Sequence, residues 1–139
     1  MQIGVDTQRA VETKRALIVD SDDISAMALQ FMLADELEVN IVATSADAGA
    51  RTRAPDVILL GTSAMANEGA QVLGSLAVAF PGVPIIAFGP AADPAVALAL
   101  AHGARSAIVR PFKVVAVRQR VNAQIGRRAV LAIPVVLGA

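Results

Sequence analysis

Apolar residues follow two kinds of spacing along this chain. Five short runs are rich in aliphatic and β-branched residues and are bounded by charged residues, glycine or proline, a pattern typical of buried strands. These runs cover residues 15–20, 38–44, 56–60, 83–88 and 106–109. After them, apolar residues recur every three or four positions, as on one side of an amphipathic helix. The spacing predicts helices over residues 46–53, 68–80, 93–102 and 113–126, and a first helix that Asp22 or Asp23 caps and that carries Ile24, Met27, Phe31 and Met32.

Strands that alternate with helices predict a (βα)5 fold, in which five parallel strands form one doubly wound sheet with helices on both faces. The run over residues 56–60 is almost entirely apolar, as expected for a strand covered on both sides. In sheets of this class, sites form where the strands reach their carboxyl ends. The candidate residues are those that follow the predicted strands: Asp20, Ser21, Asp22, Asp23, Thr44, Ser45, Gly61, Thr62, Ser63, Gly89 and Arg110.

Composition excludes several classes of function. The chain has 139 residues, which suits one domain, and its 55% hydrophobic and 17% charged residues exclude intrinsic disorder. It has no cysteine, so disulfide scaffolds, thiolate-bound zinc and thiol chemistry are excluded. A formal net charge of zero and only 3% aromatic residues argue against nucleic acid as a partner.

The long uncharged run over residues 69–92 contains glycines and prolines, and Pro84 would break a spanning helix. The run predicts a helix, a turn and a strand, and no membrane span. Residues 1–14 lack the apolar core of a secretion signal, and residues 127–139 are too few to cross a bilayer. We therefore expect a cytoplasmic protein with an N-terminal extension over residues 1–14, one domain over residues 15–126 and an apolar tail over residues 127–139.

A series of short motifs runs through residues 15–126. They are LIVD at residues 17–20, PDVILL at residues 55–60, Gly69 after the third strand, VPII at residues 83–86, HGA at residues 102–104 and RPF at residues 110–112. In this order and spacing they make the chain similar to the receiver domains of bacterial response regulators. The resemblance implies the flavodoxin-like receiver fold, and it suggests a cis peptide bond between Arg110 and Pro111.

The resemblance also implies a phosphorylation pocket, because receivers carry a phosphoryl group on an aspartate. In the family, an acidic pair after the first strand holds Mg²⁺, and an aspartate after the third strand attacks phosphorus. Here the first acid is Asp20, the second position is Ser21 with Asp22 one place later, and the nucleophile position is Gly61. An acyl phosphate needs a carboxylate nucleophile, and Mg²⁺ usually needs one or two carboxylates. We expect phosphorylation to be lost, Mg²⁺ binding to be lost or weak, and no other cofactor.

The remaining family positions have also changed. Gly89 replaces the threonine or serine that contacts the phosphoryl group after the fourth strand, and Arg110 replaces the lysine after the fifth. Ala107 stands where the family has an aromatic residue that switches with phosphorylation. Arg110 keeps the positive charge, and we expect it to pair with Asp20 in place of a metal ion. The alternative is that Arg110 points to solvent and that the neighbouring acids only cap a helix.

Charge and apolar surface suggest where a partner binds. Residues 1–93 contain 5 basic and 12 acidic side chains, whereas residues 94–139 contain 7 basic and no acidic ones. The predicted helix over residues 93–102 has almost no polar side, and contiguous exposed apolar surface marks interaction sites. In receivers the fourth helix, fifth strand and fifth helix form the usual partner and dimer face. The candidate interface residues are Val96, Ala99, Arg105, Val114, Val115 and Arg118.

These observations predict a degenerate receiver, without enzymatic activity, that binds a protein partner or a second copy independently of phosphorylation. One alternative is a receiver phosphorylated on a hydroxyl, since Ser21, Thr62 and Ser63 follow predicted strands. A hydroxyl nucleophile needs a base, and the only histidine, His102, lies on the helix before the fifth strand. Another alternative is a regulatory module of a secretion system, because pilus-assembly ATPases of the tight-adherence type carry similar degenerate receivers.

Overall fold

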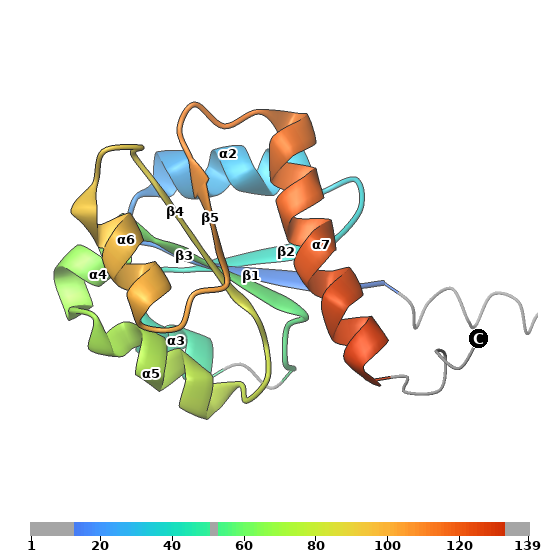
Figure 1. The fold of residues 1–139 in the computed structure, drawn as a ribbon, viewed down its shortest axis with the longest axis horizontal. Helices are drawn as coiled ribbons and strands as arrows, with labels where there is room; N and C mark the ends of the chain where they lie inside the picture. The colour runs from blue at the N-terminus through green and yellow to red at the C-terminus, as the bar shows by residue number, and fades with distance from the viewer. Residues whose placement is uncertain (1–12, 51–52, 133–139) are drawn as a thin grey trace, which may run out of the picture.

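The computed structural model describes residues 13–50 and 53–132, the last six of them as backbone only. Within these residues, five strands form one sheet: β1 (Arg15–Val19), β2 (Glu38–Val42), β3 (Val57–Gly61), β4 (Ile85–Gly89) and β5 (Ser106–Val109). All neighbouring strands are parallel, and their order is β2-β1-β3-β4-β5 (Figure 1). The predicted doubly wound parallel sheet is confirmed, and each strand begins and ends within two residues of its predicted bounds.

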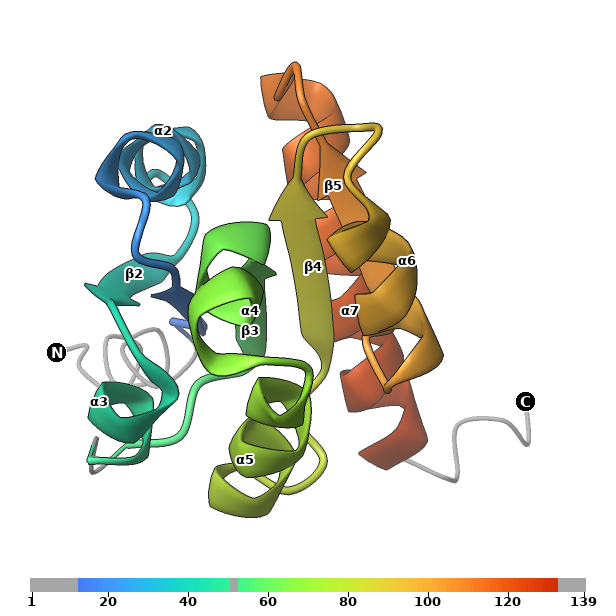
Figure 2. The ribbon, with the colours of Figure 1, turned by 90° about the vertical axis from the view of Figure 1, so that its left-hand side faces the viewer.

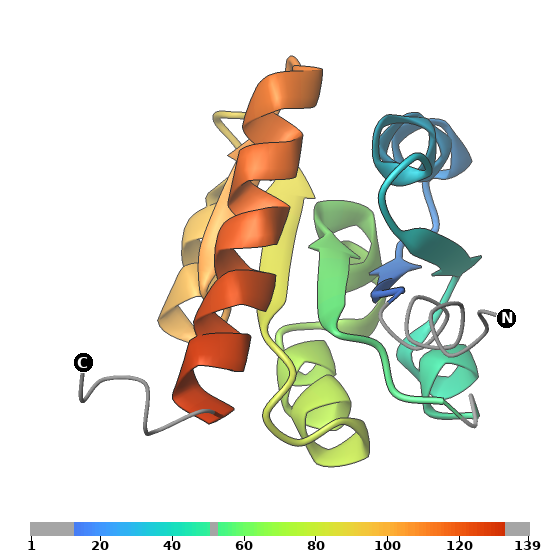
Figure 3. The same ribbon diagram turned by 90° about the vertical axis from the view of Figure 1, so that its right-hand side faces the viewer.

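Helices cover both faces of this sheet. They are α2 (Asp23–Leu33), α3 (Ser45–Gly49), α4 (Thr62–Glu68), α5 (Gln71–Ala79), α6 (Pro94–Ala101) and α7 (Val114–Ala132). Helices α2 and α7 pack on one face, and the other four pack on the opposite face (Figures 2 and 3). No helix among residues 13–50 and 53–132 is long and apolar enough to cross a membrane.

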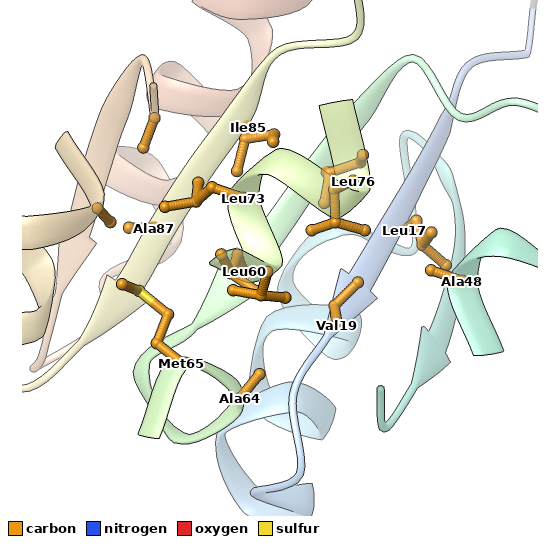
Figure 4. Close-up of a cluster of buried hydrophobic side chains, with 14 of the residues drawn as sticks. Leu17, Val19, Ala48, Leu60, Ala64, Met65, Leu73, Leu76, Ile85 and Ala87 are labelled. Carbon is orange, nitrogen blue, oxygen red and sulfur yellow. The ribbon is translucent and has the colours of Figure 1, made fainter. Parts of the chain in front are cut away.

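The core lies in two layers because successive side chains of a strand point to opposite faces. In β3, Ile58 and Leu60 join the cluster under α3 to α6, whereas Val57 and Leu59 join the cluster under α2 and α7. All four are fully buried. Figure 4 shows the first cluster, in which Leu60 lies among side chains of α4, α5 and the neighbouring strands. Burial on both faces is why this strand is apolar throughout.

The helices depart from prediction at three places. The helix expected over residues 68–80 is α5, which begins only at Gln71, and α4, over Thr62–Glu68, was not predicted; Gly69, with a φ of 85°, ends α4 and separates the two. Helix α3 ends at Gly49, short of the predicted residue 53. Helix α7 continues to Ala132, so its backbone runs past residue 126 into the predicted apolar tail. The rest of that tail and most of the predicted N-terminal extension lie outside the described residues.

Helix α2 is capped as predicted, but of the four apolar residues that led to its prediction only Met32 packs against the core, and it is half-buried. Ile24, Met27 and Phe31 are 82%, 60% and 83% exposed. The buried side of the helix consists instead of Ser25, Ala26, Leu29 and Leu33. Residues 26, 29 and 33 have the same three-and-four spacing as residues 24, 27 and 31, so periodicity alone cannot say which set faces the sheet.

Candidate functional site

The carboxyl ends of the strands bring most of the predicted site residues to one edge of the sheet. Asp20 follows β1, Gly61 ends β3 and Gly89 ends β4. The register pairs Val19 with Leu60 and Gly61 with Phe88, so these strand ends lie level with each other. Thr62 begins α4 directly after Gly61. This is the topological position at which doubly wound sheets bind their ligands.

Asp20 is buried at this edge and caps a helix that has no cap of its own. The N-cap residue of α4 is Gly61, which has no side chain to accept a hydrogen bond. The amide of Ala64, in the first turn of α4, donates to Oδ1 of Asp20 at 3.2 Å. Asp20 is only 2% exposed, and this burial raises its pKa to about 6 from an ordinary 3.8, against the lowering effect of the Ala64 bond.

The Asp20 carboxylate fills the space where a side chain of residue 61 would begin. A Cβ placed on Gly61 would lie 2.2 Å from Cγ of Asp20 and within 2.5 Å of both its carboxylate oxygens. The backbone does not require glycine here, because φ is −80° and ψ is 150°. Glycine is therefore needed for space, because the Asp20 carboxylate occupies the volume that a side chain at residue 61 would need.

The same arrangement recurs one strand along. A Cβ on Gly89 would lie 2.5 Å from Oγ1 and 2.7 Å from Cγ2 of Thr62. Thr62 is 7% exposed, so its side chain is packed into this space. Each of the two glycines thus faces a side chain that follows the neighbouring strand: Gly61 faces Asp20 after β1, and Gly89 faces Thr62 after β3. Asp20 and Thr62 fill the space that side chains at residues 61 and 89 would occupy.

The other acids of this edge serve as helix caps or supports. Asp22 is the N-cap of α2, and its carboxylate accepts from the amides of Ile24 and Ser25 and from the Ser25 hydroxyl at 3.0 Å. The bond from the Ser25 hydroxyl is the main reason why the pKa of Asp22 is lowered. Ser21 is exposed, and its hydroxyl accepts from Nδ2 of Asn67 at 2.9 Å. Within the described residues, no three acidic or histidine side chains gather to hold a metal ion.

One contact at this edge was missed by the sequence analysis. The Glu68 carboxylate, at the end of α4, accepts from the backbone amide of Ser45 at 3.0 Å and from the Ser45 hydroxyl. Ser45 opens α3, whose N-cap Thr44 accepts from the amide of Asp47. Ser45 follows a predicted strand, which was a signal, but nothing local indicates that Glu68 reaches it from 23 positions away.

Arg110 does not make the expected pair with Asp20. Its side chain is exposed and forms no ion pair with any described residue. Its positive charge contributes to the lowered pKa of Asp22, as the smallest of the causes. The expectation that Arg110 stands in for a metal ion beside Asp20 is therefore wrong, and the alternative, with Asp22 as a helix cap, is correct. The Arg110–Pro111 peptide bond is cis, as the resemblance suggested.

The predicted interface residues divide into two groups. Val96 and Ala99 are buried at 9% and 0% exposure, so they belong to the core and cannot meet a partner. Helix α6 turns these two residues to the sheet and exposes Leu98 and Leu100 instead. Arg118 is half-buried, because its Nε donates to the Met32 carbonyl of α2. Three predicted residues are exposed: Arg105, Val114 and Val115.

The remaining predicted positions are placed as follows. Ala107, where the resemblance implied an aromatic switch residue, is half-buried on β5. His102 lies at the end of α6, exposed, with Nδ1 3.0 Å from the Leu98 carbonyl. Asp93 is the N-cap of α6, and its carboxylate accepts from the Ala95 amide.

Comparisons with known proteins identify the fold. No family model matches the sequence, and no curated protein matches it either. Among solved structures, the chain is similar to a CheY-like receiver domain protein from Methanospirillum hungatei, with 23% identity, 85% of this chain and 98% of that chain covered, and a TM-score of 0.72.

Two further structures give the same result. The receiver domain of NtrX from Brucella abortus is 20% identical, with 80% of this chain and 98% of that chain covered and a TM-score of 0.71. A two-component response regulator from Clostridium difficile is 18% identical, with 83% and 98% covered and a TM-score of 0.70. The chain therefore has the fold of response-regulator receiver domains.

Proposed function

We propose that this chain is a degenerate receiver that does not accept a phosphoryl group and acts as a protein-interaction module in two-component-type signalling in the cytoplasm. One observation carries the proposal: the Asp20 carboxylate occupies the space above Gly61 in which the acceptor aspartate of a receiver would stand. The domain has no catalytic role in this proposal.

The chemistry of the edge supports the loss of phosphorylation. An acyl phosphate forms only when a carboxylate reaches the phosphorus atom, and Gly61 provides none. Asp20 is 2% exposed and is bonded to the start of α4, so it is not free to attack a donor from solvent. The Thr62 hydroxyl is buried beside Gly89, and the single histidine of the chain, His102, lies at the end of α6, where it provides no base for Thr62.

An exposed apolar surface supports the interaction role. Leu98 and Leu100 of α6, Val109 of β5, and Val114 and Val115 of α7 are each between 41% and 68% exposed. They lie on three consecutive elements of the chain, at the edge of the sheet formed by β5. Exposed apolar side chains on adjoining elements favour a protein contact. We name these five residues the α6–β5–α7 face and propose that it binds the partner.

The test is labelling with a small phosphodonor. The protein is incubated with acetyl phosphate and Mg²⁺, and its intact mass is measured with and without the donor. We expect no increase by one phosphoryl group, either in the natural sequence or in Gly61→Asp, whose new side chain would compete with Asp20 for the same space. A stoichiometric adduct on the natural sequence would overturn the proposal. Peptide mapping of such an adduct to Ser21, Thr62 or Ser63 would establish the displaced acceptor instead.

A further inference from the structure

Helix α2 carries a stripe of apolar side chains that nothing in the described chain covers. Ile24, Met27 and Phe31 lie at positions i, i+3 and i+7, on the side of the helix opposite buried Leu29. Beside them runs a shallow groove of about 420 Å³, lined by Met27, Gln30, Phe31, Ala34 and, from β2, Val39. Three long apolar side chains in solvent on one helix are more than scattered exposure. We call Ile24, Met27 and Phe31 the α2 stripe.

The surroundings of the α2 stripe are acidic. Between Arg15 and Arg51 the sequence contains seven acidic residues and neither lysine nor arginine. Three of these acids form ion pairs: Asp35 and Glu36 with Arg118, and Glu38 with Arg15. Asp23, next to Ile24 in the first turn of α2, forms no ion pair with any described residue. A partner that covers the stripe gains affinity and register if it brings basic side chains beside apolar ones.

This chain itself exposes a surface of that chemistry. Val109, Val114 and Val115 are 41%, 41% and 68% exposed, and the basic residues Arg110 and Lys113 between them are exposed as well. No acidic residue follows Asp93 in the sequence. We call residues 109–115 the basic edge. It spans the end of β5 and the start of α7 and includes three residues of the α6–β5–α7 face, Val109, Val114 and Val115.

Helix α2, which carries the α2 stripe, and helix α7, which begins in the basic edge, cover the same face of the sheet. Helices α2 and α7 pack side by side over the same core cluster (Figure 1). The two helices are joined where Nε of Arg118 donates to the Met32 carbonyl at 2.9 Å and Nδ2 of Asn122 donates to Glu36. When two copies meet about a two-fold axis, complementary patches on two helices of one face can cover each other reciprocally.

We propose that a second copy of this chain covers the α2 stripe, with the copies related by a two-fold axis so that the α2 stripe of each lies on the basic edge of the other. The inference rests on the proposed function in that it uses the β5–α7 part of the α6–β5–α7 face. Six of the nine large exposed apolar side chains of the described residues lie in these two patches. A direct contact of α2 with α2 would bring acids against acids, whereas the reciprocal contact pairs acids with bases.

Replacement of exposed apolar residues by glutamate tests the location of the contact. Sedimentation is measured over a concentration series for the natural sequence, Phe31→Glu, Ile24→Glu and Val115→Glu. We expect a dimer that each of these variants weakens by about tenfold or more, as for central contact residues. Val78→Glu is the matched control, because Val78 lies on α5, across the sheet from α2, and is 82% exposed, as Ile24 is. It should leave the dissociation constant unchanged.

Charge reversal tests the reciprocal geometry. Asp23→Lys alone and Lys113→Glu alone place like charges at both contacts of a homodimer, so each variant should dissociate. When the two variants are mixed, both contacts of the mixed pair have opposite charges, so the dimer should return. This recovery also shows that neither variant is unfolded, since a misfolded chain would not associate on mixing.

The outcomes separate this inference from the proposed function. A natural sequence that stays monomeric at high concentration overturns the inference, and the phosphodonor result stands independently of it. Dimers that Val115→Glu weakens but Phe31→Glu and Ile24→Glu do not would also overturn it, while leaving the α6–β5–α7 face as the interaction surface. Failure of the mixed charge variants to associate would exclude the reciprocal two-fold contact.

Discussion

Replacement of Gly61 by alanine is the most direct test of how this strand edge is built. The backbone at residue 61 has φ −80° and ψ 150°, which alanine adopts without strain. In such a conformation, the change from glycine to alanine normally stabilises a protein by about 0.4–1 kcal/mol, because it restricts the unfolded chain. We expect the opposite sign here, because the new Cβ would lie 2.2 Å from Cγ of Asp20.

The size of the effect follows from what Asp20 must give up. Carbon atoms in contact are about 3.5–4.0 Å apart, so the carboxylate has to move by more than 1 Å. Displacement breaks its bond to the Ala64 amide, the side-chain cap of α4, and loss of a helix cap costs about 1 kcal/mol. Forcing an extra carbon atom into a packed site costs about 1–3 kcal/mol. After the glycine-to-alanine gain is subtracted, Gly61→Ala should destabilise the fold by about 1–3 kcal/mol.

The protonation state of Asp20 sets the best conditions for this measurement. Because burial raises the pKa of Asp20 to about 6, its ionised form regains hydration if it is pushed out of the site. Above pH 6 this hydration of Asp20 offsets part of the destabilisation caused by Gly61→Ala. At pH 5 the offset is smaller. The assay is urea unfolding followed by far-ultraviolet circular dichroism at pH 5 and pH 8, since the chain has no tryptophan or tyrosine for fluorescence. The larger loss of stability is expected at pH 5.

A double-mutant cycle isolates the contact between residues 61 and 20. In an Asp20→Ala background the obstruction is absent, so Gly61→Ala should be neutral or stabilising there, and the two changes should be non-additive by about 1–3 kcal/mol. Gly74→Ala is the matched control: a Cβ at this exposed position of α5 meets nothing within 4 Å, and alanine there should stabilise by about 0.5–1 kcal/mol. If Gly61→Ala stabilises the natural sequence as Gly74→Ala does, Asp20 does not occupy the space above Gly61.

Two further predictions concern charge at the same edge. The folded-state pKa of Asp20, about 6, lies above its ordinary value of 3.8, so the folded state favours the protonated form. The natural sequence should therefore lose up to about 3 kcal/mol of stability as the pH rises from 4 to 7. Asp20→Asn keeps an oxygen for the Ala64 amide and should lose this dependence; parallel stability curves for the two proteins between pH 4 and 7 would contradict the raised pKa. Arg110→Ala should change the free energy of unfolding by less than about 0.5 kcal/mol at pH 7, because Arg110 is exposed and has no ion pair with a described residue. A loss above 1 kcal/mol in urea unfolding would show that its charge supports the acids after all.

The sheet could be predicted closely because its signal is local and repeated. A parallel strand covered on both faces needs apolar side chains at every position, and Val57 to Leu60 satisfy this without regard to the rest of the chain. The cap of α2 is also local, since Asp22 bonds to amides two and three positions away. The absence of a carboxylate at residue 61 follows from one letter of the sequence.

What the sequence did not reveal depends on contacts between distant positions. Asp20 was expected to pair with Arg110. It lies instead over Gly61 and accepts from the Ala64 amide, 44 positions away, because β1 and β3 are neighbours in the sheet. The bond between Asp20 and the Ala64 amide forms because the register of β1 and β3 places their carboxyl ends level with each other. A buried carboxylate takes a nearby backbone donor in preference to a solvated guanidinium across the edge.

The identity of the exposed surface was likewise decided by packing. Two sets of residues on α2 share one helical spacing, and the docking of Ala26, Leu29 and Leu33 against the sheet left Phe31 and its neighbours outside. On α6 the same choice buried Val96 and Ala99 and exposed Leu98. Sequence by itself determined the five strands, most of the helices and the absence of a carboxylate at residue 61. Only the tertiary structure decided which side of each helix meets the sheet, because that choice depends on the shape of the surface opposite and not on the order of residues along the helix.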